Sequence, residues 1–323
     1  MSVLSTQKLS IGYSKKGIDT IVQSGLELEL RAGELVCLIG PNGSGKSTLL
    51  RTLAGLQKPL GGRIKIDNSD LAKLNQHERA MQFALVLTDR VDIENATVRD
   101  IVSFGRHPHS DWWGNLTDEE NAMIQESIIA VHLGHKINSF LNELSDGERQ
   151  RVMIAKALAQ DTPIILLDEP TAHLDLPNRV EIMLLLHKLA HKTQKSILLS
   201  THELDMALQA ADRIWLITEK KGVECGVPED LVFNGSFNRA FQSKSFVFNS
   251  ANGNFSMNYP MNRKVWVTGD KTRMYWTLRA LARAGFEVTE DAEIKIEISE
   301  NSWSLNQTTF TSVESLLAGL EKI

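Results

Sequence analysis

Apolar residues in this chain form short continuous runs, separated by longer segments in which they recur every three or four positions. Three runs are wholly apolar, Leu35–Ile39, Ile164–Leu167 and Ile197–Leu199, which is the pattern of strands buried on both faces of a sheet. Arg213–Thr218 predicts a fourth strand, and segments between the runs, such as Val180–Ala190, predict helices. Strands that alternate with helices indicate an α/β fold with a mostly parallel sheet and helices on both of its faces.

Two segments depart from this alternation. Gly25–Leu30 places leucine and glutamate at alternate positions, which predicts a half-buried strand and, with its neighbours, an N-terminal antiparallel β subdomain. Over about residues 89–160, apolar strand runs give way to helical patterns such as Asp118–Val131 and Gly147–Ala159. We therefore expect a helical insertion in the sheet domain over this range.

The last part of the chain predicts a second domain. Residues 249–262 are rich in Asn, Ser and Gly and contain Pro260, a composition typical of loops. Beyond them, strand and helix patterns alternate again. We expect a main domain over residues 1–245, a linker over 246–262 and a small α/β domain over 263–323.

Composition and charge narrow the class of protein. The chain has 323 residues, 42% of them apolar, and a net charge of −5, so no basic surplus points to nucleic acid. Two cysteines, Cys37 and Cys225, cannot form a disulfide framework, which fits a reducing cytosol. The sequence shows neither the layout of a signal peptide nor a run approaching the ~20 apolar residues of a membrane span. We expect any membrane association to depend on a partner protein.

A glycine-rich segment follows the first buried strand and matches the pattern G-x-x-x-x-G-K-[ST]. With the residue after it, the segment consists of Gly40, Pro41, Asn42, Gly43, Ser44, Gly45, Lys46, Ser47 and Thr48. Glycines let backbone N–H groups curve around phosphates, and the start of a helix adds positive dipole character. We expect Lys46 to reach the β- and γ-phosphates of a nucleotide and the Ser47 hydroxyl to bind Mg²⁺.

Two acids, Asp168 and Glu169, directly follow the buried run Ile164–Leu167. The carboxyl end of a strand is where an open α/β sheet binds its ligand. We expect Asp168 to hold Mg²⁺ through water, and Glu169 to act on the attacking water as its base or its orienter. The alternative is an ordinary solvated strand end, which the nearby glycine-rich segment disfavours.

A further motif, Leu144–Arg151 (Leu-Ser-Asp-Gly-Glu-Arg-Gln-Arg), precedes the second buried strand. With the glycine-rich segment and the two acids, it resembles the signature sequence of ATP-binding cassette (ABC) ATPases, and the resemblance covers roughly residues 1–245. It implies a P-loop NTPase fold and a head-to-tail homodimer, in which Ser145 and Gly147 of one subunit face the ATP held by the other. Hydrolysis then removes the γ-phosphate that holds the two halves together.

The resemblance also assigns roles to single residues. Tyr13 matches the aromatic on which the family stacks adenine, although a Tyr at a strand end is also an ordinary feature. Asp175 matches the loop that communicates across the dimer. His202 matches the switch histidine that contacts the γ-phosphate.

The insertion indicates a branch of the family. It contains segments that resemble ATPases of ferric-siderophore, haem and cobalamin importers, namely Ser103–His109, Trp112–Gly114 and Thr117–Glu120. In those importers a groove beside the insertion accepts a short cytoplasmic helix of the permease. The alternatives are that both tryptophans pack inside the insertion, and that His107 and His109 form a metal site, which no carboxylate or Cys cluster supports.

Three positions differ from the family pattern. After the signature Ser, the family has Gly-Gly-Gln where this chain has Asp146, Gly147 and Glu148. We expect Asp146 to repel the γ-phosphate of the partner's ATP and so to weaken closure of the dimer. The family also has a Mg²⁺-binding Gln at the end of the strand before the insertion, where this chain has Thr88. We expect the shorter hydroxyl, aided by water or Asp89, to alter the coupling between ATP and permease.

Taken together, the resemblance implies an ATPase that uses ATP and Mg²⁺ to power import of an iron chelate (siderophore or haem) or cobalamin. The implied partners are a second copy of the chain, integral membrane permease subunits and, indirectly, a substrate-binding protein, but no nucleic acid. The protein would lie at the cytoplasmic face of the inner or plasma membrane. The alternatives are a soluble ABC ATPase outside transport and an ATP-gated regulator. For the C-terminal domain, a regulatory or dimer-supporting role and a stabilising appendage both stay open.

Overall fold

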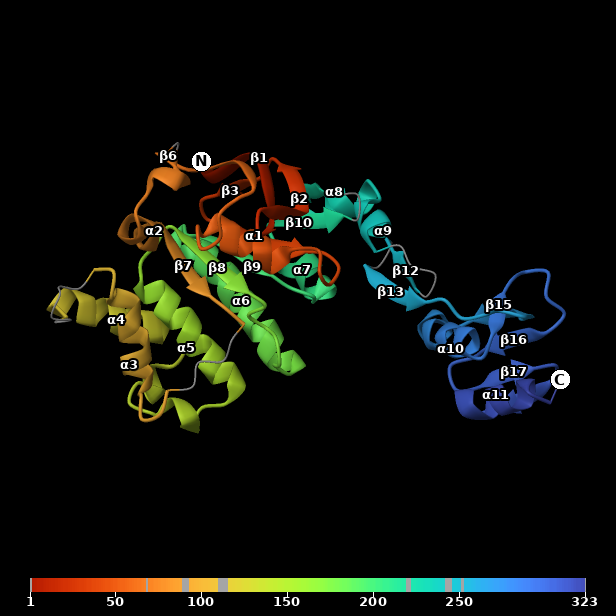
Figure 1. The fold of residues 1–323 in the computed structure, drawn as a ribbon. Helices are drawn as coiled ribbons and strands as arrows, with labels where there is room; N and C mark the ends of the chain where they lie inside the picture. Colours follow the sequence, from red (N-terminus) through yellow and green to blue (C-terminus); the bar gives the residue numbers. More distant parts are fainter. Residues whose placement is uncertain are drawn as a thin grey trace. The chain divides into compact units, whose positions relative to one another are not determined.

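The chain folds into two compact units (Figure 1). The computed structural model describes residues 2–67, 69–88, 93–109, 116–218, 222–241, 246–250 and 253–322. The larger unit consists of Met1–Gln242 and Phe248–Asn254, and the smaller of Ser243–Val247 and Phe255–Ile323.

A six-stranded sheet forms the centre of the larger unit (Figure 1). Its strand order is β11-β10-β4-β9-β8-β7, and every neighbouring pair is parallel except β10 with β11. The strands are β4 (Leu35–Ile39), β7 (Phe83–Val86), β8 (Ile164–Asp168), β9 (Ser196–Ser200), β10 (Arg213–Thr218) and β11 (Gly222–Gly226). Every residue of β4, β8 and β9 is buried. The mostly parallel α/β sheet predicted from the apolar runs is confirmed.

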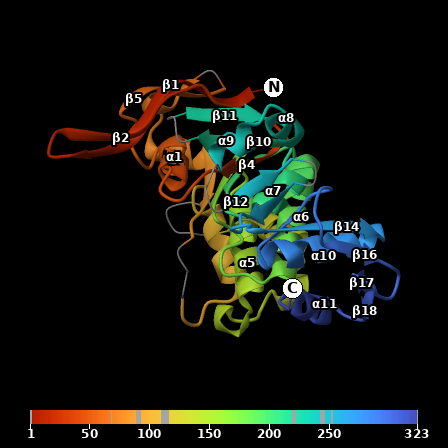
Figure 2. The same ribbon diagram turned by 90° about the vertical axis from the view of Figure 1, so that its right-hand side faces the viewer.

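A second, antiparallel sheet is built from the N-terminal segment. Its strands are β1 (Ser2–Lys15), β2 (Ile18–Leu26), β3 (Glu29–Arg31), β5 (Gly61–Ile66) and β6 (Ser69–Asp70), and the β1–β2 hairpin extends beyond the others (Figure 2). The continuous strand expected over Gly25–Leu30 is interrupted. The Thr6 hydroxyl donates to Leu26 O and accepts the N–H of Leu28, so these bonds replace the strand ladder before β3 begins.

The helix α1 (Lys46–Leu53) packs between the two sheets. Its leucines belong to one buried cluster with alternate residues of β4 and with residues of β1 and β2. Helices α6 (Leu176–Thr193) and α7 (Leu204–Ala210) contact β4 as well. Because successive residues of a strand point to opposite faces, β4 holds both layers together and fixes the start of α1 at its carboxyl end.

A helical insertion lies between β7 and β8, as predicted. Its elements are α3 (Val98–Ser103), η2 (Phe104–Arg106), α4 (Asp118–Ala130), η3 (Gly134–Lys136), η4 (Leu141–Glu143) and α5 (Asp146–Ala159). A Cβ on Gly105 would lie 2.3 Å from the backbone oxygen of Lys156, and Arg106 donates to the backbone oxygen of Ala159 at 2.8 Å. The Gly-Arg pair of the importer-like segment therefore packs α3 and η2 against α5.

Short elements complete the larger unit. They are η1 (Leu71–Lys73), α2 (Gln76–Gln82), α8 (Pro228–Phe233) and α9 (Ser236–Ala240). No helix among the described residues combines the length and apolar character needed to span a bilayer.

The smaller unit has its own sheet and core. Its strands are β14 (Arg263–Gly269), β15 (Phe286–Val288), β16 (Lys295–Ile298), β17 (Trp303–Leu305) and β18 (Thr308–Phe310), in the order β15-β14-β16-β17-β18. Two helices, α10 (Lys271–Arg283) and α11 (Val313–Leu320), pack on the sheet and contribute Leu281 and Leu316 to its core. Where a linker was expected, the chain forms the two-stranded sheet of β12 (Phe246–Asn249) and β13 (Asn254–Met257).

Candidate functional site

Polar residues gather at the carboxyl ends of the central strands, which is the edge where open parallel sheets bind ligands. A cleft of about 320 Å³ opens there. It is lined by Tyr13, Val22, Asn42, Gly43, Gly45, Lys46, Ser47, Thr48, Glu169 and His202. All of these residues except Val22 are ones that the sequence assigns to nucleotide binding or to catalysis.

The glycine-rich loop that follows β4 needs its glycines for two reasons. Gly45 has φ of +102° and lies so close to Val22 that a Cβ would approach that side chain to 2.5 Å. Gly43 has φ of +75°, and a Cβ there would meet nothing within 4 Å. Gly45 lets the loop close tightly at the start of α1. Gly43 leaves the loop backbone open to a ligand in the cleft.

Lys46 is an almost wholly buried cation, with 5% of its surface exposed. Its Nζ donates to the backbone oxygens of Gly40 (2.9 Å) and Pro41 (3.2 Å), which are both neutral. Burial lowers the pKa of the Lys46 ammonium, while the carboxylates of Glu169 and Asp168 oppose that shift. A buried cation held by neutral groups favours an anionic ligand, so the loop fits the phosphates of a nucleotide.

A second polar group in the loop points to the same conclusion. Within the described part of the chain, the buried Ser44 Oγ has no hydrogen-bond partner. The loop backbone itself is held by Gln23, whose amide donates to the backbone oxygen of Ser44 at 3.1 Å. Buried polar atoms are usually satisfied, so an unpaired hydroxyl in this loop is consistent with a site that a polar ligand completes.

Oxygen atoms that suit Mg²⁺ surround Asp168 at the end of β8. Its Oδ1 accepts from Ser47 Oγ (3.1 Å) and from Ser200 Oγ (2.7 Å). The hydroxyl of Thr88, two residues after the adjacent β7, donates to the backbone oxygen of Asp168 at 2.9 Å. Hydroxyl and carboxylate oxygens are the ligands that Mg²⁺ prefers, so this donor set fits the ion. Asp89, the alternative to Thr88, lies outside the described residues.

The side chains of Glu169 and His202 are in contact in the cleft. His202 Nε2 lies 2.5 Å from Glu169 Oε1. Glu169 adopts φ of +53°, a conformation that costs a non-glycine residue ~1 kcal/mol or more, and its N–H donates to Ser200 Oγ at 3.0 Å. The strained backbone therefore presents the carboxylate to the cleft next to the histidine.

Sequence reasoning missed Ser200 as a site residue. It ends the buried strand β9, and the parallel pairing of β8 with β9 sets it directly opposite Asp168. The signal was a polar residue at the end of a wholly apolar run, next in the chain to Thr201-His202.

Tyr13 stands at the rim of the cleft. Its hydroxyl forms a 2.7 Å hydrogen bond with Thr48 Oγ1 in the first turn of α1, and 56% of its surface is exposed. The bond fixes the ring beside the loop while leaving a face open, as stacking against a base requires.

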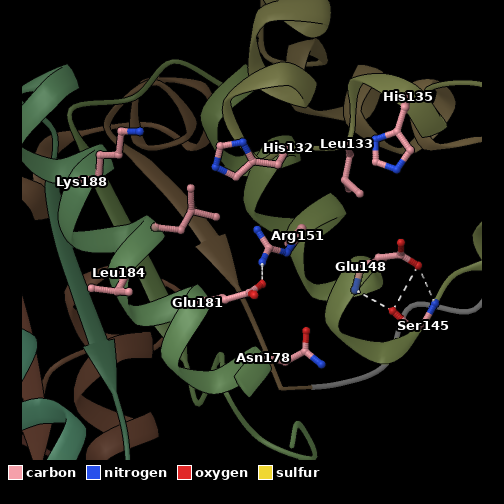
Figure 3. Close-up of a pocket in the computed structure, with 11 residues that line it drawn as sticks. His132, Leu133, His135, Ser145, Glu148, Arg151, Asn178, Glu181, Leu184 and Lys188 are labelled. Atoms are coloured by element: carbon pink, nitrogen blue, oxygen red, sulfur yellow. Dashed lines mark hydrogen bonds and ion pairs between the residues drawn. The ribbon is translucent and has the colours of Figure 1, made fainter. Parts of the chain in front are cut away.

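Ser145 lies in a different cavity from the phosphate loop (Figure 3). This cavity, of about 570 Å³, opens between α5, α6 and the segment after α4. Figure 3 shows Ser145 and Glu148 at the start of α5, with Arg151 pointing toward Glu181 of α6. Within one chain, the structure thus brings together the loop and the two acids, but not the signature residues.

Helix α5, which begins within the signature sequence and is called the signature helix below, packs closely on the start of α6. A Cβ on Gly147 would lie 2.6 Å from Asn178 Oδ1, so only glycine fits there without a shift. Asn178 in turn donates through Nδ2 to Asp175 Oδ1 at 2.6 Å, and Asp175 also caps α6 by accepting the N–H of Asn178. Asn178, which the sequence did not single out, therefore connects Gly147 with Asp175.

The structure explains why an acid, Glu148, stands where the family has Gln. Ser145 and Glu148 form a capping box, with Ser145 N–H donating to Glu148 Oε2 at 3.0 Å. Lys136 Nζ lies 2.5 Å from the other carboxylate oxygen. The hydrogen bond with Lys136, more than the bonds with Ser145, holds the pKa of Glu148 below its usual range. An acid in place of the family's Gln thus anchors the start of α5 to η3.

Two further expectations concern the insertion. The His109 ring nitrogen lies 2.9 Å from the backbone oxygen of Gln160, which gives this histidine a packing role in place of the weak metal site. Trp112 and Trp113 lie outside the described residues, so their expected place beside a permease groove stays a prediction.

The sequence is similar to those of known proteins. The family described as “ABC transporter” matches residues 23–172, and the “Iron ABC transporter C-terminal domain” matches residues 262–321. The chain is 39% identical to an uncharacterized ABC transporter ATP-binding protein of Methanocaldococcus jannaschii, over 82% of this chain and 91% of that protein. It is 35% identical to an iron(3+)-hydroxamate import ATP-binding protein of Bacillus subtilis, over 69% of this chain and 80% of that protein.

A solved structure is similar as well. The dimeric structure of a bacterial ABC transporter cassette is 29% identical in sequence and superimposes with a TM-score of 0.59. The match covers 68% of this chain and 96% of that one.

Proposed function

The chain belongs to the ABC transporter ATP-binding family, whose members are ATPases coupled to transport, and we propose that this one powers import of an iron chelate through a membrane permease. The observation that carries the proposal is the meeting of Lys46, Ser47, Asp168, Glu169 and His202 at one edge of the sheet.

The residues of the cleft have separate roles in ATP binding and hydrolysis. Lys46 and the loop backbone bind the phosphates of ATP, and Tyr13 supports the base. Ser47, Asp168 and Thr88 would hold Mg²⁺, and the ion would neutralise charge on the phosphates. Glu169 accepts the proton of the water whose oxygen attacks the γ-phosphorus, with ADP as the leaving group. His202, 2.5 Å from Glu169, fixes that carboxylate and senses the γ-phosphate.

We infer a composite site formed by two copies of the chain. Ser145 and Gly147 lie outside the cleft of their own chain, and a similar cassette has a dimeric structure. In a head-to-tail dimer, the N–H groups at the start of α5 of one copy face the γ-phosphate held by the other. Asp175, linked to Gly147 through Asn178, couples the two sites.

The transported substrate is proposed to be a ferric siderophore. The iron(3+)-hydroxamate relative and the match to the iron transporter C-terminal domain support this choice. Haem and cobalamin are the other chelates that the importer-like segments allow. The partners are integral permease subunits and, indirectly, a substrate-binding protein, with the ATPase at the cytoplasmic face of the membrane.

The catalytic assignment is tested with Glu169→Gln. We expect this variant to keep ATP binding and to lose hydrolysis by about 100-fold or more, because the general base is gone. Glu119→Gln, an exposed acid on α4, serves as the matched control and should hydrolyse ATP at the parent rate. Steady-state phosphate release and equilibrium nucleotide binding give the two readouts. A Glu169→Gln variant as fast as the parent would show that the base lies elsewhere.

The transport assignment needs the native partner. The chain is purified from membranes with its permease, reconstituted in vesicles and assayed for ATPase activity with binding protein and ferric hydroxamate, haem or cobalamin. Stimulation by ferric hydroxamate supports the proposed substrate class, and stimulation by haem or cobalamin alone overturns it. An ATPase that associates with no permease would favour the soluble alternative.

A further inference from the structure

A cluster of two histidines and a carboxylate lies in the larger unit, away from the cleft. His187 and His191 are one turn apart on α6, and Asp212 directly precedes β10. Their ligand atoms all lie within 4.8 Å of one another. We propose that His187, His191 and Asp212 bind a divalent first-row transition-metal ion such as Zn²⁺ or Fe²⁺.

The distances in the cluster suit a bound metal ion as well as the hydrogen bonds between His191 and Asp212. Asp212 Oδ1 lies 3.0 Å from His191 Nε2 and 3.7 Å from His187 Nε2. In a tetrahedral site with bonds of about 2.1 Å, neighbouring ligand atoms lie roughly 3.4 Å apart. The two observed separations bracket that value. The His187 contact is too long for a hydrogen bond, so the carboxylate satisfies His191 and leaves His187 facing it.

The helix holds the two rings side by side. Residues four apart lie on the same face of a helix, and the ring centroids of His187 and His191 are 4.4 Å apart at an interplanar angle of 48°. Two protonated imidazoles at this distance would repel each other, whereas a metal ion binds both in their neutral form. The helix therefore places both rings where a single ion can bind them.

The carboxylate is held rigidly by β4. Leu35 N–H donates to Asp212 Oδ2 at 2.8 Å, and Asp212 N–H donates back to the Leu35 oxygen at 2.9 Å. The neighbouring Arg213 pairs with Glu34 at 3.8 Å, so its charge is directed to another acid. Hydrogen bonds from outside a metal site orient its ligands and raise affinity. Here Leu35 anchors Oδ2, which also lies 3.1 Å from His191 Nε2, while Oδ1 lies within 3.7 Å of both histidines.

The ligand set selects the class of ion. Imidazole nitrogen with a single carboxylate suits Zn²⁺, Fe²⁺ and their neighbours, while Mg²⁺ and Ca²⁺ prefer oxygen-only sites. The three side chains are 43%, 49% and 24% exposed, in the order His187, His191 and Asp212, so water completes the coordination. The site is open to ions from solvent.

The cluster is separate from the nucleotide cleft. Asp212 stands at the amino end of β10, whereas the cleft lies at the carboxyl ends of the strands. Along α6, His191 is about 24 Å from the cap residue Asp175 at a rise of ~1.5 Å per residue. An ion held there takes no part in ATP chemistry. The metal-site proposal can therefore be tested independently of the proposed transport function.

Cobalt titration of the full, tag-free chain without nucleotide tests the proposal, because bound Co²⁺ reports its ligands in visible absorption. We expect one equivalent to bind, Zn²⁺ to displace it and millimolar Mg²⁺ to leave it in place. His187→Gln and His191→Gln should each weaken binding by about tenfold or more. Asp212→Asn should weaken binding as well, with circular dichroism to verify that this variant keeps its fold.

Two controls make the result specific. His77→Gln removes an exposed histidine on α2, and His135→Gln removes one from the cavity beside the signature helix. Both should bind Co²⁺ as the parent does. Absence of stoichiometric binding, or a loss caused by His135→Gln but not by His187→Gln and His191→Gln, would overturn the proposal.

Discussion

At the scale of single residues, Ser200 connects the two acids of the cleft. Its hydroxyl donates to Asp168 Oδ1 and accepts the N–H of Glu169, at 2.7 and 3.0 Å. One side chain therefore orients the proposed Mg²⁺-binding carboxylate and also supports the strained backbone of the proposed base. Ser200 touches neither ATP nor water in this scheme, so it is a positioning residue.

We expect Ser200→Ala to lower ATPase turnover at saturating ATP by about tenfold, because small displacements of a catalytic group are costly. Ser196→Ala is a matched control, since Ser196 is also buried on β9 and donates one hydrogen bond, to the Arg31 oxygen at 2.8 Å. Each variant should lose ~1 kcal/mol of stability in urea unfolding. If both variants or neither lose turnover, Ser200 has no special role.

These residues also show what the sequence can predict about the site. Lys46, Ser47, Asp168 and Glu169 belong to local motifs that follow wholly apolar runs, so their positions could be predicted. The role of Ser200 depends on the register that sets it opposite Asp168. Apolar runs of similar composition do not specify which strands pair or in what register, and this contact could not be predicted.

At the scale of elements, the start of α5 is stabilised by charge. Lys136 holds Glu148 at 2.5 Å and lowers the pKa of its carboxyl below the ordinary 4.5. A carboxyl whose pKa is lower in the folded state stabilises the fold above the unfolded pKa. That contribution is lost as the pH falls through the lowered, folded-state pKa. The anchor of the signature helix is therefore present at neutral pH and absent in strong acid.

Lys136→Met should lower the melting temperature at pH 7, and this deficit relative to the parent should shrink progressively below pH ~4.5. The exposed Lys192, at the end of α6, gives a matched control as Lys192→Met. Melting by circular dichroism from pH 7 to 3 measures both differences. A deficit for Lys136→Met that stays constant across this range would rule out the ion pair with Glu148 as its cause.

Element prediction succeeded where burial was complete. The strands β4, β8 and β9 are buried at every position, so their apolar runs were unambiguous. The three-residue strands β17 and β18 are too short to show a period. The interruption near Leu28 arises from a side chain distant in sequence, Thr6, and no local pattern reports it.

At the scale of the whole molecule, the two halves of the proposed active site occupy separate cavities of one chain. We propose that a second copy brings Ser145 and Gly147 to the ATP of the first. The signature sequence, taken by resemblance, predicts this arrangement, whereas composition and periodicity do not report on a partner. The stability of the proposed dimer then depends on Asp146, the exposed residue between Ser145 and Gly147.

Asp146 lies in the first turn of α5, where its charge favours the helix dipole of its own chain. In the proposed closed dimer the same carboxylate would approach the γ-phosphate of the partner's ATP, and like charges repel. In a Glu169→Gln background that traps ATP, Asp146→Gly and Asp146→Asn should therefore tighten the dimer by about tenfold, in light scattering or sedimentation. The gain should shrink at high salt, because screening weakens the repulsion. Asp118→Asn, the equivalent exposed acid at the start of α4, should leave dimerisation unchanged. If Asp146→Asn does so as well, Asp146 does not oppose closure.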